Sequence, residues 1–250
     1  MTSNQLLEIT VPTQSRSIIL EEIKKYIRQS TDFCHVVSLN PENLIIAQKD
    51  RLFKKVIQTA QIKIIDGIGI VLAARMLGIP IGERISGVEV MKNLITCAGK
   101  GSLTVLLVGG RGDLALKLSK CYQEKFPEAK FIGSEGFKNI RKPTKREEEK
   151  ILSIVRSIKP NLIFAAYGSP WQELWIERHK RKFKGIVVMG VGQGFDVEGG
   201  VARRAPVWVQ RLGFEWLFRL VTQPWRWRRQ LKLIEFMWLV MKQKFSSNHE

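Results

Sequence analysis

The sequence is poor in cysteine and histidine, and both shortages limit its chemistry. Its 250 residues include three cysteines and three histidines. The cysteines are too few and too scattered for a disulfide framework or a C-x-x-C metal motif, so a reducing cytosol is expected. No histidine stands in a grouping that suggests a Ser-His-Asp triad. The sequence therefore gives no support to a disulfide-stapled domain or a triad hydrolase.

Long apolar runs are also lacking. No stretch offers the roughly 20 apolar residues that a membrane-spanning helix needs. No apolar run follows a basic start near the N-terminus, so no signal peptide is expected. Hydrophobic residues nevertheless make up 44% of the chain, which suffices for the core of one large or two small domains. We expect a globular protein.

Acidic residues are scarce relative to basic ones. The chain has 41 lysines and arginines against 23 aspartates and glutamates, a formal net charge of +18. This excess predicts a polyanionic partner such as nucleic acid, anionic lipid or a phosphorylated ligand. Between residues 201 and 245 the basic residues are mixed with apolar runs and with five of the seven tryptophans. Such a mixture is typical of a membrane-surface segment, the alternative being that these apolar faces pack on the core or on another subunit.

Short apolar runs alternate with helical patterns over nearly two hundred residues. This alternation predicts an α/β fold with a Rossmann-like, mostly parallel sheet and flanking helices. The first step is expected to be a strand over 6–11 and a helix over 17–28, and 44–60 is expected to be mostly helical. Further strands are expected over 35–39, 62–65, 103–108, 129–133, 161–166 and 185–190.

The pattern becomes wholly helical after residue 203, with helices expected over 208–221 and 225–244. We therefore divide the chain into a core of residues 1–200 and a basic, tryptophan-rich helical appendage of residues 201–250.

Polar side chains stand where two of the expected strands end, which is where open α/β sheets bind ligands. Asp66 follows the strand over 62–65 and precedes a helix that starts after glycine. The alternative is that Asp66 only caps this helix. Ser38 and Asn40 end the preceding strand, and taken singly they are more typical of turn residues.

Further candidates follow the later strands. Arg84 lies in a turn-rich connector, where it faces an anion or pairs with a neighbouring glutamate. Gly109 and Gly110 leave a bare backbone that can approach a phosphate or sugar closely, although the full G-x-G-x-x-G pattern is lacking. Gly168 precedes a helix start that carries the amide of Gln172 and the carboxylate of Glu173, which suit a base or ribose, with helix capping as the alternative. Asp196 follows the last expected strand and is a further candidate.

If these loops form one crevice, it is rich in hydroxyl and amide groups and holds one or two carboxylates. No two aspartates have the i, i+2 spacing with which many sugar-nucleotide enzymes hold a divalent ion. Arginines and helix N-termini would then neutralise a departing diphosphate. We expect no metal and no cofactor.

Eight short motifs occur in order along nearly the whole chain. They are Ser38–Glu42, Asp66–Gly69, Glu83–Gly87, Val108–Gly110, Gly168–Glu173, Gly192–Asp196, Arg204–Pro206 and Glu215–Arg219. Together they resemble the WecG/TagA/CpsF glycosyltransferase family. The resemblance implies metal-independent, inverting transfer of a sugar, with N-acetylmannosamine or its uronic acid favoured, from a UDP donor. The implied acceptor is a polyprenyl-diphosphate-linked N-acetylglucosamine in bacterial surface-polysaccharide synthesis.

The resemblance also assigns roles by position. Asp66 matches the family's catalytic base, and Ser38 stands where the family usually has threonine, which keeps a hydroxyl for a sugar contact. Arg84 matches an arginine facing the donor diphosphate and Gln172 a residue near the nucleotide, whereas Glu89 stands where aspartate is expected. The expected donor site also includes Asn40, Gly109, Gly110, Gly168, Glu173 and Asp196. The arginines matched to the acceptor's lipid diphosphate are Arg219, Arg226 and Arg229.

The expected partners are therefore a UDP-sugar, a polyprenyl-diphosphate-linked acceptor and an anionic membrane surface, and not nucleic acid. The expected location is cytoplasmic, peripheral on the inner face of the cell membrane. Assembly into a homo-oligomer is a further possibility, and the sequence does not fix the number of subunits. One alternative is the same fold with UDP-glucose or another hexose donor. Others are a non-enzymatic, basic nucleic-acid- or lipid-binding protein and a protein that binds a sugar nucleotide or lipid carrier without catalysis.

Overall fold

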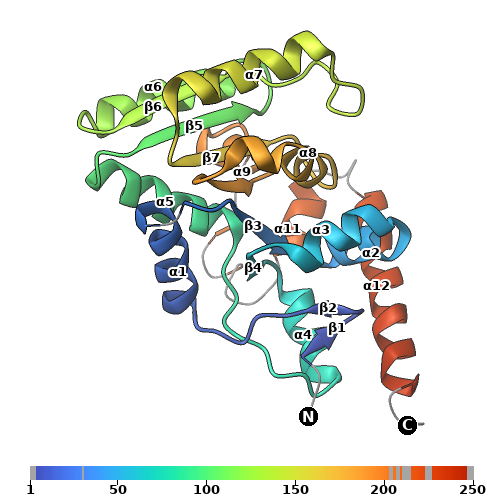
Figure 1. Cartoon of the computed structure of the whole chain (residues 1–250). Coiled ribbons are helices and arrows are strands. Elements are labelled where there is room, and N and C mark those ends of the chain that lie inside the picture. Colours follow the sequence, from blue (N-terminus) through green and yellow to red (C-terminus); the bar gives the residue numbers. More distant parts are fainter. Residues whose placement is uncertain are drawn as a thin grey trace.

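The computed structural model describes residues 4–29, 31–202, 205–206, 209, 215–222 and 227–246. Their centre is a six-stranded sheet in the order β4-β3-β8-β7-β5-β6 (Figure 1). Every pair of neighbouring strands in it is parallel, so the predicted α/β fold is confirmed. The strands are β3 (Cys34–Leu39), β4 (Ile62–Ile65), β5 (Thr104–Gly109), β6 (Lys130–Ser134), β7 (Leu162–Ala166) and β8 (Val187–Gly190).

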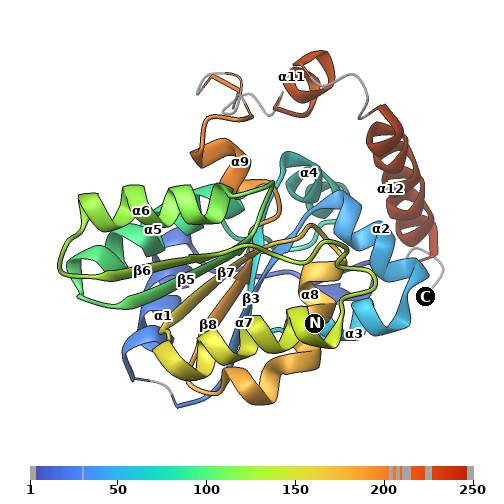
Figure 2. The same cartoon turned by 90° about the horizontal axis from the view of Figure 1, so that it is seen from above.

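Helices cover both faces of the sheet (Figure 2). One face carries α1 (Arg16–Gln29), α5 (Gly87–Lys100), α6 (Leu114–Lys125) and α9 (Gly194–Glu198). The other carries α2 (Pro41–Lys49), α3 (Arg51–Thr59), α7 (Lys145–Ile158), α8 (Trp171–His179) and the short 3-10 helix η1 (Lys180–Phe183). The remaining core helix, α4 (Ile68–Met76), follows β4 and packs with the second set near α2.

Alternate residues of each strand enter opposite layers of the core. In β5, Val105 and Leu107 belong to the cluster under α5 and α6, whereas Leu106 and Val108 pack under α7 and α8. All four are fully buried. A parallel sheet covered on both faces favours apolar residues at successive positions, which explains the apolar runs of β5, β7 and β8.

The order of the strands creates a switch point between β3 and β8. The chain leaves β3 toward the edge strand β4, then crosses to build β5 and β6, and returns inward through β7 to β8. After β3 it enters α2 on one face, and after β8 it enters α9 on the other. The chain therefore leaves these neighbouring strand ends toward opposite faces, and doubly wound sheets bind ligands at such a switch point.

The expected first strand over 6–11 is wrong. Instead β1 (Gln5–Leu6) and β2 (Ile9–Thr10) form an antiparallel hairpin outside the main sheet. Leu7 and Glu8 make its turn with φ values of 50° and 63°, because a two-residue hairpin loop favours left-handed residues. The strand ends Leu6 and Ile9 are fully buried in the second core layer, and this long-range packing is not visible in the local sequence.

The expectation that 44–60 is mostly helical is confirmed, with the helical segment divided between α2 and α3 at Asp50. This residue has an extended backbone with φ −126° and ψ 105°, and its side chain accepts a hydrogen bond from the backbone N–H of Phe53. Aspartate in this position is a common helix N-cap, so the break has a local signal in the sequence.

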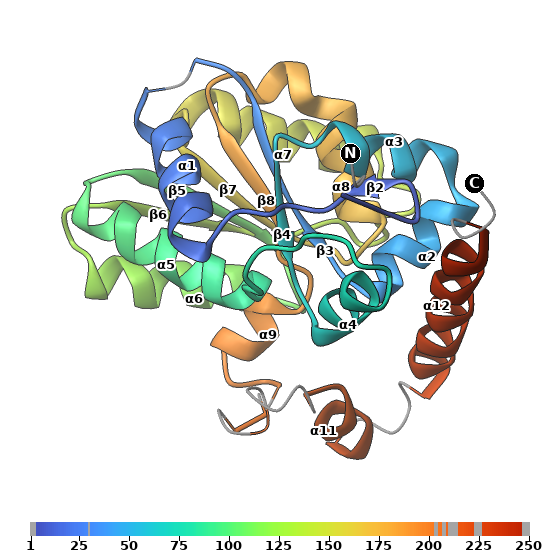
Figure 3. The same ribbon diagram turned by 90° about the horizontal axis from the view of Figure 1, so that it is seen from below.

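The two longer described stretches of the appendage are helical, whereas residues 201–202 and 205–206 are not. Its helices are α11 (Glu215–Thr222) and α12 (Trp227–Ser246), whereas much of the expected start at 208–214 lies outside the described residues. In Figures 1 and 3, α12 runs alongside α2. In Figures 2 and 3, α11 lies between α9 and α12. The domain boundary at residue 200 stays a prediction. None of the helices described is both long and apolar enough to pass through a membrane.

The contacts of α12 with the core are both apolar and polar. Phe236 and Val240 are fully buried in the layer that also holds α2 and α4. The side chain of Gln243 accepts from the N–H of Leu7 at 2.8 Å and donates to the carbonyl of Gln5 at 2.9 Å. Salt bridges Lys232–Glu42 at 2.9 Å and Lys49–Glu235 at 2.6 Å join α12 to α2.

A buried histidine predicts an acid-sensitive fold. His35 in β3 is 1% exposed, and burial lowers its pKa from 6.5 to about 3. As the pH falls below 6.5, the unfolded chain therefore binds a proton at this position before the folded chain does, and the free energy of unfolding falls. We expect His35 to account for a loss of about 2 kcal/mol between pH 7 and pH 5. Urea unfolding at both pH values should show that His35→Leu lacks this loss, whereas equal losses would contradict the assignment.

Candidate functional site

Asp66 and Ser38 lie together at the carboxyl ends of β4 and β3. The register pairs Leu39 with Ile65, so these side chains leave neighbouring strands at the same edge of the sheet. A Cβ built on Gly87 would lie 3.1 Å from Ser38 Oγ and 3.4 Å from Asp66 Oδ2. A hydroxyl and a carboxylate thus lie around the first residue of α5, which has no side chain of its own.

Asp66 is not the cap of the helix that follows it. The N-cap of α4 is Gly67, with a φ of 108° and no side-chain capping bond. Instead Asp66 Oδ2 accepts a hydrogen bond of 3.1 Å from the backbone N–H of Gly87. The positive end of the α5 dipole therefore points at this carboxylate.

Asn40 and Ser38 are joined to the start of α2. The side chain of Asn40 is the N-cap of this helix and accepts from the N–H of Asn43 at 2.9 Å. The Asn43 side chain in turn donates to the carbonyl of Ser38 at 2.9 Å. These bonds give Asn40 the turn-forming role that we weighed as its alternative, and they fix the backbone that presents the Ser38 hydroxyl.

The connector before α5 runs beside the end of β4. Arg84 forms an isolated parallel bridge with Ile65, and the N–H of Ile85 donates to the carbonyl of Ile65 at 3.0 Å. Arg84 is half-buried. This bridge sets the start of the Arg84 side chain next to the strand end that carries Asp66.

Gln172 joins the loops that follow β7 and β8. It is 3% exposed. Its side-chain oxygen accepts from the N–H of Gly168 at 3.0 Å and from the N–H of Gly192 at 3.1 Å. Its amide donates to Glu173 Oε1 at 2.8 Å. Gln172 therefore uses its side chain to hold two glycine loops at a fixed separation at the sheet edge.

Glu173 is a buried carboxyl group behind this brace. It is 2% exposed, and its Oε1 also accepts from Ser169 Oγ at 2.8 Å. Within the described part of the chain, Oε2 has no hydrogen-bond partner. Burial raises the pKa of Glu173 above its usual range, and the hydrogen bonds from Gln172 and Ser169 oppose this shift.

The glycine pair after β5 lies beside the start of α9. Gly109 and Gly110 have φ values of 88° and 82°, a conformation that glycine adopts without strain. Arg111, the next residue, approaches Asp196 of α9 with Nε 3.5 Å from Oδ1. Arg111 is largely exposed, whereas Asp196 is buried. A bare turn and a guanidinium group thus stand together at this end of the site.

The structure describes only part of the three arginines that we matched to the acceptor's lipid diphosphate. Arg219 and Arg229 belong to α11 and α12, but the structure does not describe their side chains. Arg226 lies outside the described residues. The acceptor-binding role of all three stays a prediction.

The structure thus brings the predicted core residues to one edge of the sheet as two groups. The first lies at β3 and β4, and the second lies at β5, at β7 and at the helix that follows β8. The residues are Ser38, Asn40, Asp66 and Arg84 in the first group, and Gly109, Gly110, Gly168, Gln172, Glu173 and Asp196 in the second. Their roles in binding and catalysis stay predictions.

Two members of the site escaped the sequence analysis. Arg111 follows the glycine pair directly, so its position in the sequence was a usable signal. The Gly87 N–H follows from the segment Ser86–Glu89, because serine followed by glutamate three residues later is a capping box and predicts a helix that begins at Gly87. Among the described residues, no group of three histidine, cysteine, aspartate or glutamate side chains is placed to hold a metal ion.

Comparison with known proteins gives a consistent result. The sequence profile described as the glycosyl transferase WecG/TagA/CpsF family matches residues 4–250. The chain is 31% identical over 222 residues to the N-acetylglucosaminyldiphosphoundecaprenol N-acetyl-beta-D-mannosaminyltransferase of Bacillus subtilis (strain 168), covering 88% of this chain and 84% of that protein. It is 30% identical over 228 residues to the protein of the same name from Staphylococcus aureus (strain NCTC 8325 / PS 47), covering 90% and 87%.

The buried carboxyl group of Glu173 predicts that Glu173→Gln stabilises the protein by an amount that depends on pH. Because the pKa of Glu173 is raised in the folded state, the folded protein loses stability as the pH rises above the unfolded value of about 4.5. Glu173→Gln keeps an oxygen for Ser169 and Gln172 but cannot ionise. We expect the stability of this variant relative to the parent to increase between pH 4 and pH 7.

Denaturant unfolding at both pH values measures this difference. The matched control is Glu128→Gln, which changes an exposed glutamate. A Glu173→Gln difference that is independent of pH, as expected for the control, would contradict the burial argument.

Proposed function

Because the chain belongs to the WecG/TagA/CpsF family of glycosyltransferases, we propose that it transfers N-acetylmannosamine from a UDP-linked donor to a polyprenyl-diphosphate-linked N-acetylglucosamine. The predicted family is confirmed, and the protein is a hexosyltransferase. The sugar and the acceptor are taken from the name that the two relatives share. This name specifies N-acetylmannosaminyl as the group transferred and N-acetylglucosaminyldiphosphoundecaprenol as the acceptor. The uronic acid of the same sugar and UDP-glucose are the alternative donors.

The observation that carries the proposal is the position of Asp66 at the switch-point edge of the sheet. Its carboxylate is half-buried, accepts a hydrogen bond from the α5 N-terminus and has the Ser38 hydroxyl nearby. A carboxylate held in this way is available to take a proton from a bound alcohol. No catalytic histidine is needed for that step.

The reaction is proposed as a single displacement. The acceptor hydroxyl oxygen attacks the anomeric carbon, the bond from that carbon to the UDP oxygen breaks, and the hydroxyl proton passes to Asp66. UDP leaves with the electron pair of the broken bond. Since a UDP-sugar of this type is α-linked and the relatives are named as β-transferases, the displacement inverts the anomeric centre. Ser38 would orient the reacting sugar through its hydroxyl.

The leaving diphosphate needs positive charge within the site. Arg84 beside the end of β4 and Arg111 beside the glycine pair are described guanidinium groups in the two parts of the site. Backbone N–H groups of the glycine turns add donors that carry no side chain. We propose that these groups stabilise UDP in place of a divalent ion, and that Gln172 contributes by holding the two loops that flank the nucleotide.

The first test removes the proton acceptor. Asp66→Asn keeps an oxygen for the Gly87 N–H but cannot accept a proton, so we expect kcat to fall about 10²- to 10⁴-fold with donor affinity little changed. The assay follows UDP release in EDTA, with a short-chain lipid-diphosphate N-acetylglucosamine as acceptor. Donors to scan are UDP-N-acetylmannosamine, its uronate, UDP-glucose and UDP-N-acetylglucosamine.

The matched control is Asp32→Asn, which changes an exposed aspartate before β3. It should keep full activity. Undiminished turnover by Asp66→Asn would refute the role of Asp66, and dependence on added Mg²⁺ would refute the metal-independent step. Binding of a UDP-sugar without transfer to any acceptor would favour the non-catalytic alternative.

We further propose that the outward face of α12 contacts an anionic membrane surface. One side of this helix is buried against α2 and α4. The other exposes Ile234 by 68%, Trp238 by 62% and Phe245 by 59%. The ammonium group of Lys242 lies 5.8 Å from the centre of the Trp238 ring. Aromatic and aliphatic side chains beside a lysine suit the headgroup region of a bilayer, where a lipid-linked acceptor would be found.

Liposome sedimentation tests this surface. We measure binding to vesicles that contain phosphatidylglycerol. The double variant Trp238→Ser/Phe245→Ser should bind at least about tenfold more weakly, because it lacks two apolar side chains that would be buried in the bilayer. The control is Leu52→Ser, which removes a similarly exposed side chain, 61% accessible, from α3. Equal binding by both variants would contradict the assignment. Tight, salt-sensitive binding to oligonucleotides without vesicle binding would instead favour the nucleic-acid alternative.

A further inference from the structure

We propose that Glu89 is a positioning residue for Asp66, acting through the Ser86–Gly87 turn at the start of α5. The inference rests on the proposed function, because it assumes that Asp66 is the proton acceptor. Glu89 fixes the peptide group whose N–H holds the Asp66 carboxylate.

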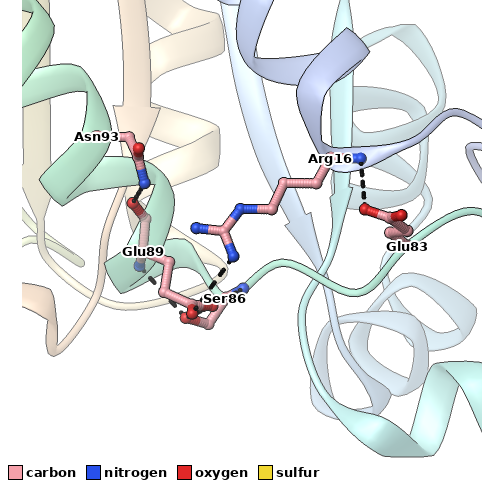
Figure 4. Close-up of polar contacts among 5 residues, drawn as sticks. All are labelled: Arg16, Glu83, Ser86, Glu89 and Asn93. Carbon is pink, nitrogen blue, oxygen red and sulfur yellow. Dashed lines mark hydrogen bonds and ion pairs between the residues drawn. The ribbon is translucent and has the colours of Figure 1, made fainter.

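The first link is a complete capping box, shown in Figure 4. Ser86 Oγ accepts from the N–H of Glu89 at 3.3 Å. Glu89 Oε2 accepts from the Ser86 backbone N–H at 3.0 Å and from its hydroxyl at 2.8 Å. Ser86 is 8% exposed. A buried residue with its hydroxyl and its N–H both engaged has little freedom to rotate.

The second link runs from this turn to the site. Ser86 is the N-cap, with φ −73° and ψ 148°, and its ψ sets the direction of the next N–H, that of Gly87. This N–H donates to Asp66 Oδ2 at 3.1 Å. If the box is lost, the Ser86–Gly87 peptide can turn, and the hydrogen bond to Asp66 lengthens or breaks.

An outer brace comes from α1. Arg16 Nη1 lies 3.8 Å from Glu89 Oε1, and the backbone N–H of Arg16 donates to Glu83 Oε2 at 3.0 Å (Figure 4). The side chains of Arg16 and Glu89 are 41% and 36% exposed, and an ion pair this exposed contributes little to stability. The capping bonds of Glu89, and not its charge, therefore carry the positioning effect.

The chain contains a second capping box with the same bonds far from the site. On α7, Glu147 Oε2 accepts from the N–H and the hydroxyl of Thr144 at 2.9 Å and 2.7 Å, and Thr144 Oγ1 accepts from the N–H of Glu147 at 3.2 Å. This box is at the surface and has no link to Asp66 among the contacts described. It separates the loss of a helix cap from the loss of positioning.

The other charged groups on the elements around Asp66 are the same in every variant below. Among the described residues they include Glu83 and Arg84 in the connector, Arg16 on α1, Lys63 on β4, Arg75 on α4, Lys92 on α5, and Glu42 of α2 paired with Lys232 of α12. A shift seen only when Glu89 changes can therefore be assigned to Glu89.

The experiment compares Glu89→Ala, Glu89→Gln, Glu147→Ala and Asp66→Asn in the UDP-release assay. We expect both alanine variants to lower Tm, but only Glu89→Ala to lower kcat, by roughly 10- to 100-fold. It should also move the acid limb of the kcat–pH profile to higher pH, because a carboxylate that loses an N–H donor holds its proton more tightly. Glu89→Gln keeps the capping geometry and should restore kcat to within a few-fold of the parent.

Three results would overturn the inference. They are an unchanged kcat and acid limb in Glu89→Ala, the same kinetic loss in Glu147→Ala, or no rescue by Glu89→Gln. If Glu89→Ala does not fold, Glu89→Asp supplies the same comparison, because its shorter side chain keeps the charge but cannot complete the box. Full activity in Asp66→Asn would refute the proposed function itself, whereas an inactive Asp66→Asn with a normal Glu89→Ala refutes only the positioning role.

Discussion

The burial of a parallel sheet on both faces is the constraint on which the rest of this structure depends. Most strand residues are therefore apolar, and the candidate polar residues gather at the edge where the strands end. All six strands of the main sheet run in the same direction, and they therefore deliver Ser38, Asp66, Gly109 and Gly168 to one edge. The reversal of strand order between β3 and β8 then sends the helices that follow them, α2 and α9, to opposite faces of the sheet.

Backbone groups do much of the work at this edge. The Asp66 carboxylate is held by a peptide N–H from α5, and Gln172 spends its side-chain oxygen on two glycine N–H groups. Glycines at these places bring peptide groups close to polar side chains where a Cβ would interfere. At Gly190, for example, a Cβ would lie 2.5 Å from Gln172 Nε2. Such bonds fix the loops before any ligand binds. They also leave the carboxyl group of Glu173 buried, which raises its pKa because burial disfavours the charged form.

The appendage combines two environments on one helix. Phe236 and Val240 of α12 are buried against the core, whereas Ile234 and Trp238 face outward. Docking of the helix answers part of the question that the sequence left open, since one apolar face does pack on the core. The exposed face is the part that remains for a membrane surface, and α12 would hold the core at a fixed orientation to it.

The sequence by itself determined the fold class, the positions of the six buried strands and the family, because period and apolar content are local and the motifs stand in order along the chain. It also placed Asp66 and Ser38 at neighbouring strand ends. Only the tertiary structure decided that residues 5–10 form a separate hairpin, that Asp66 is bound by α5 and not by its own helix, and that Gln172 joins two loops. These depend on contacts between residues far apart in the chain, such as Asp66 with Gly87 and Gln172 with Gly192, and local residue preferences carry no information about such pairs.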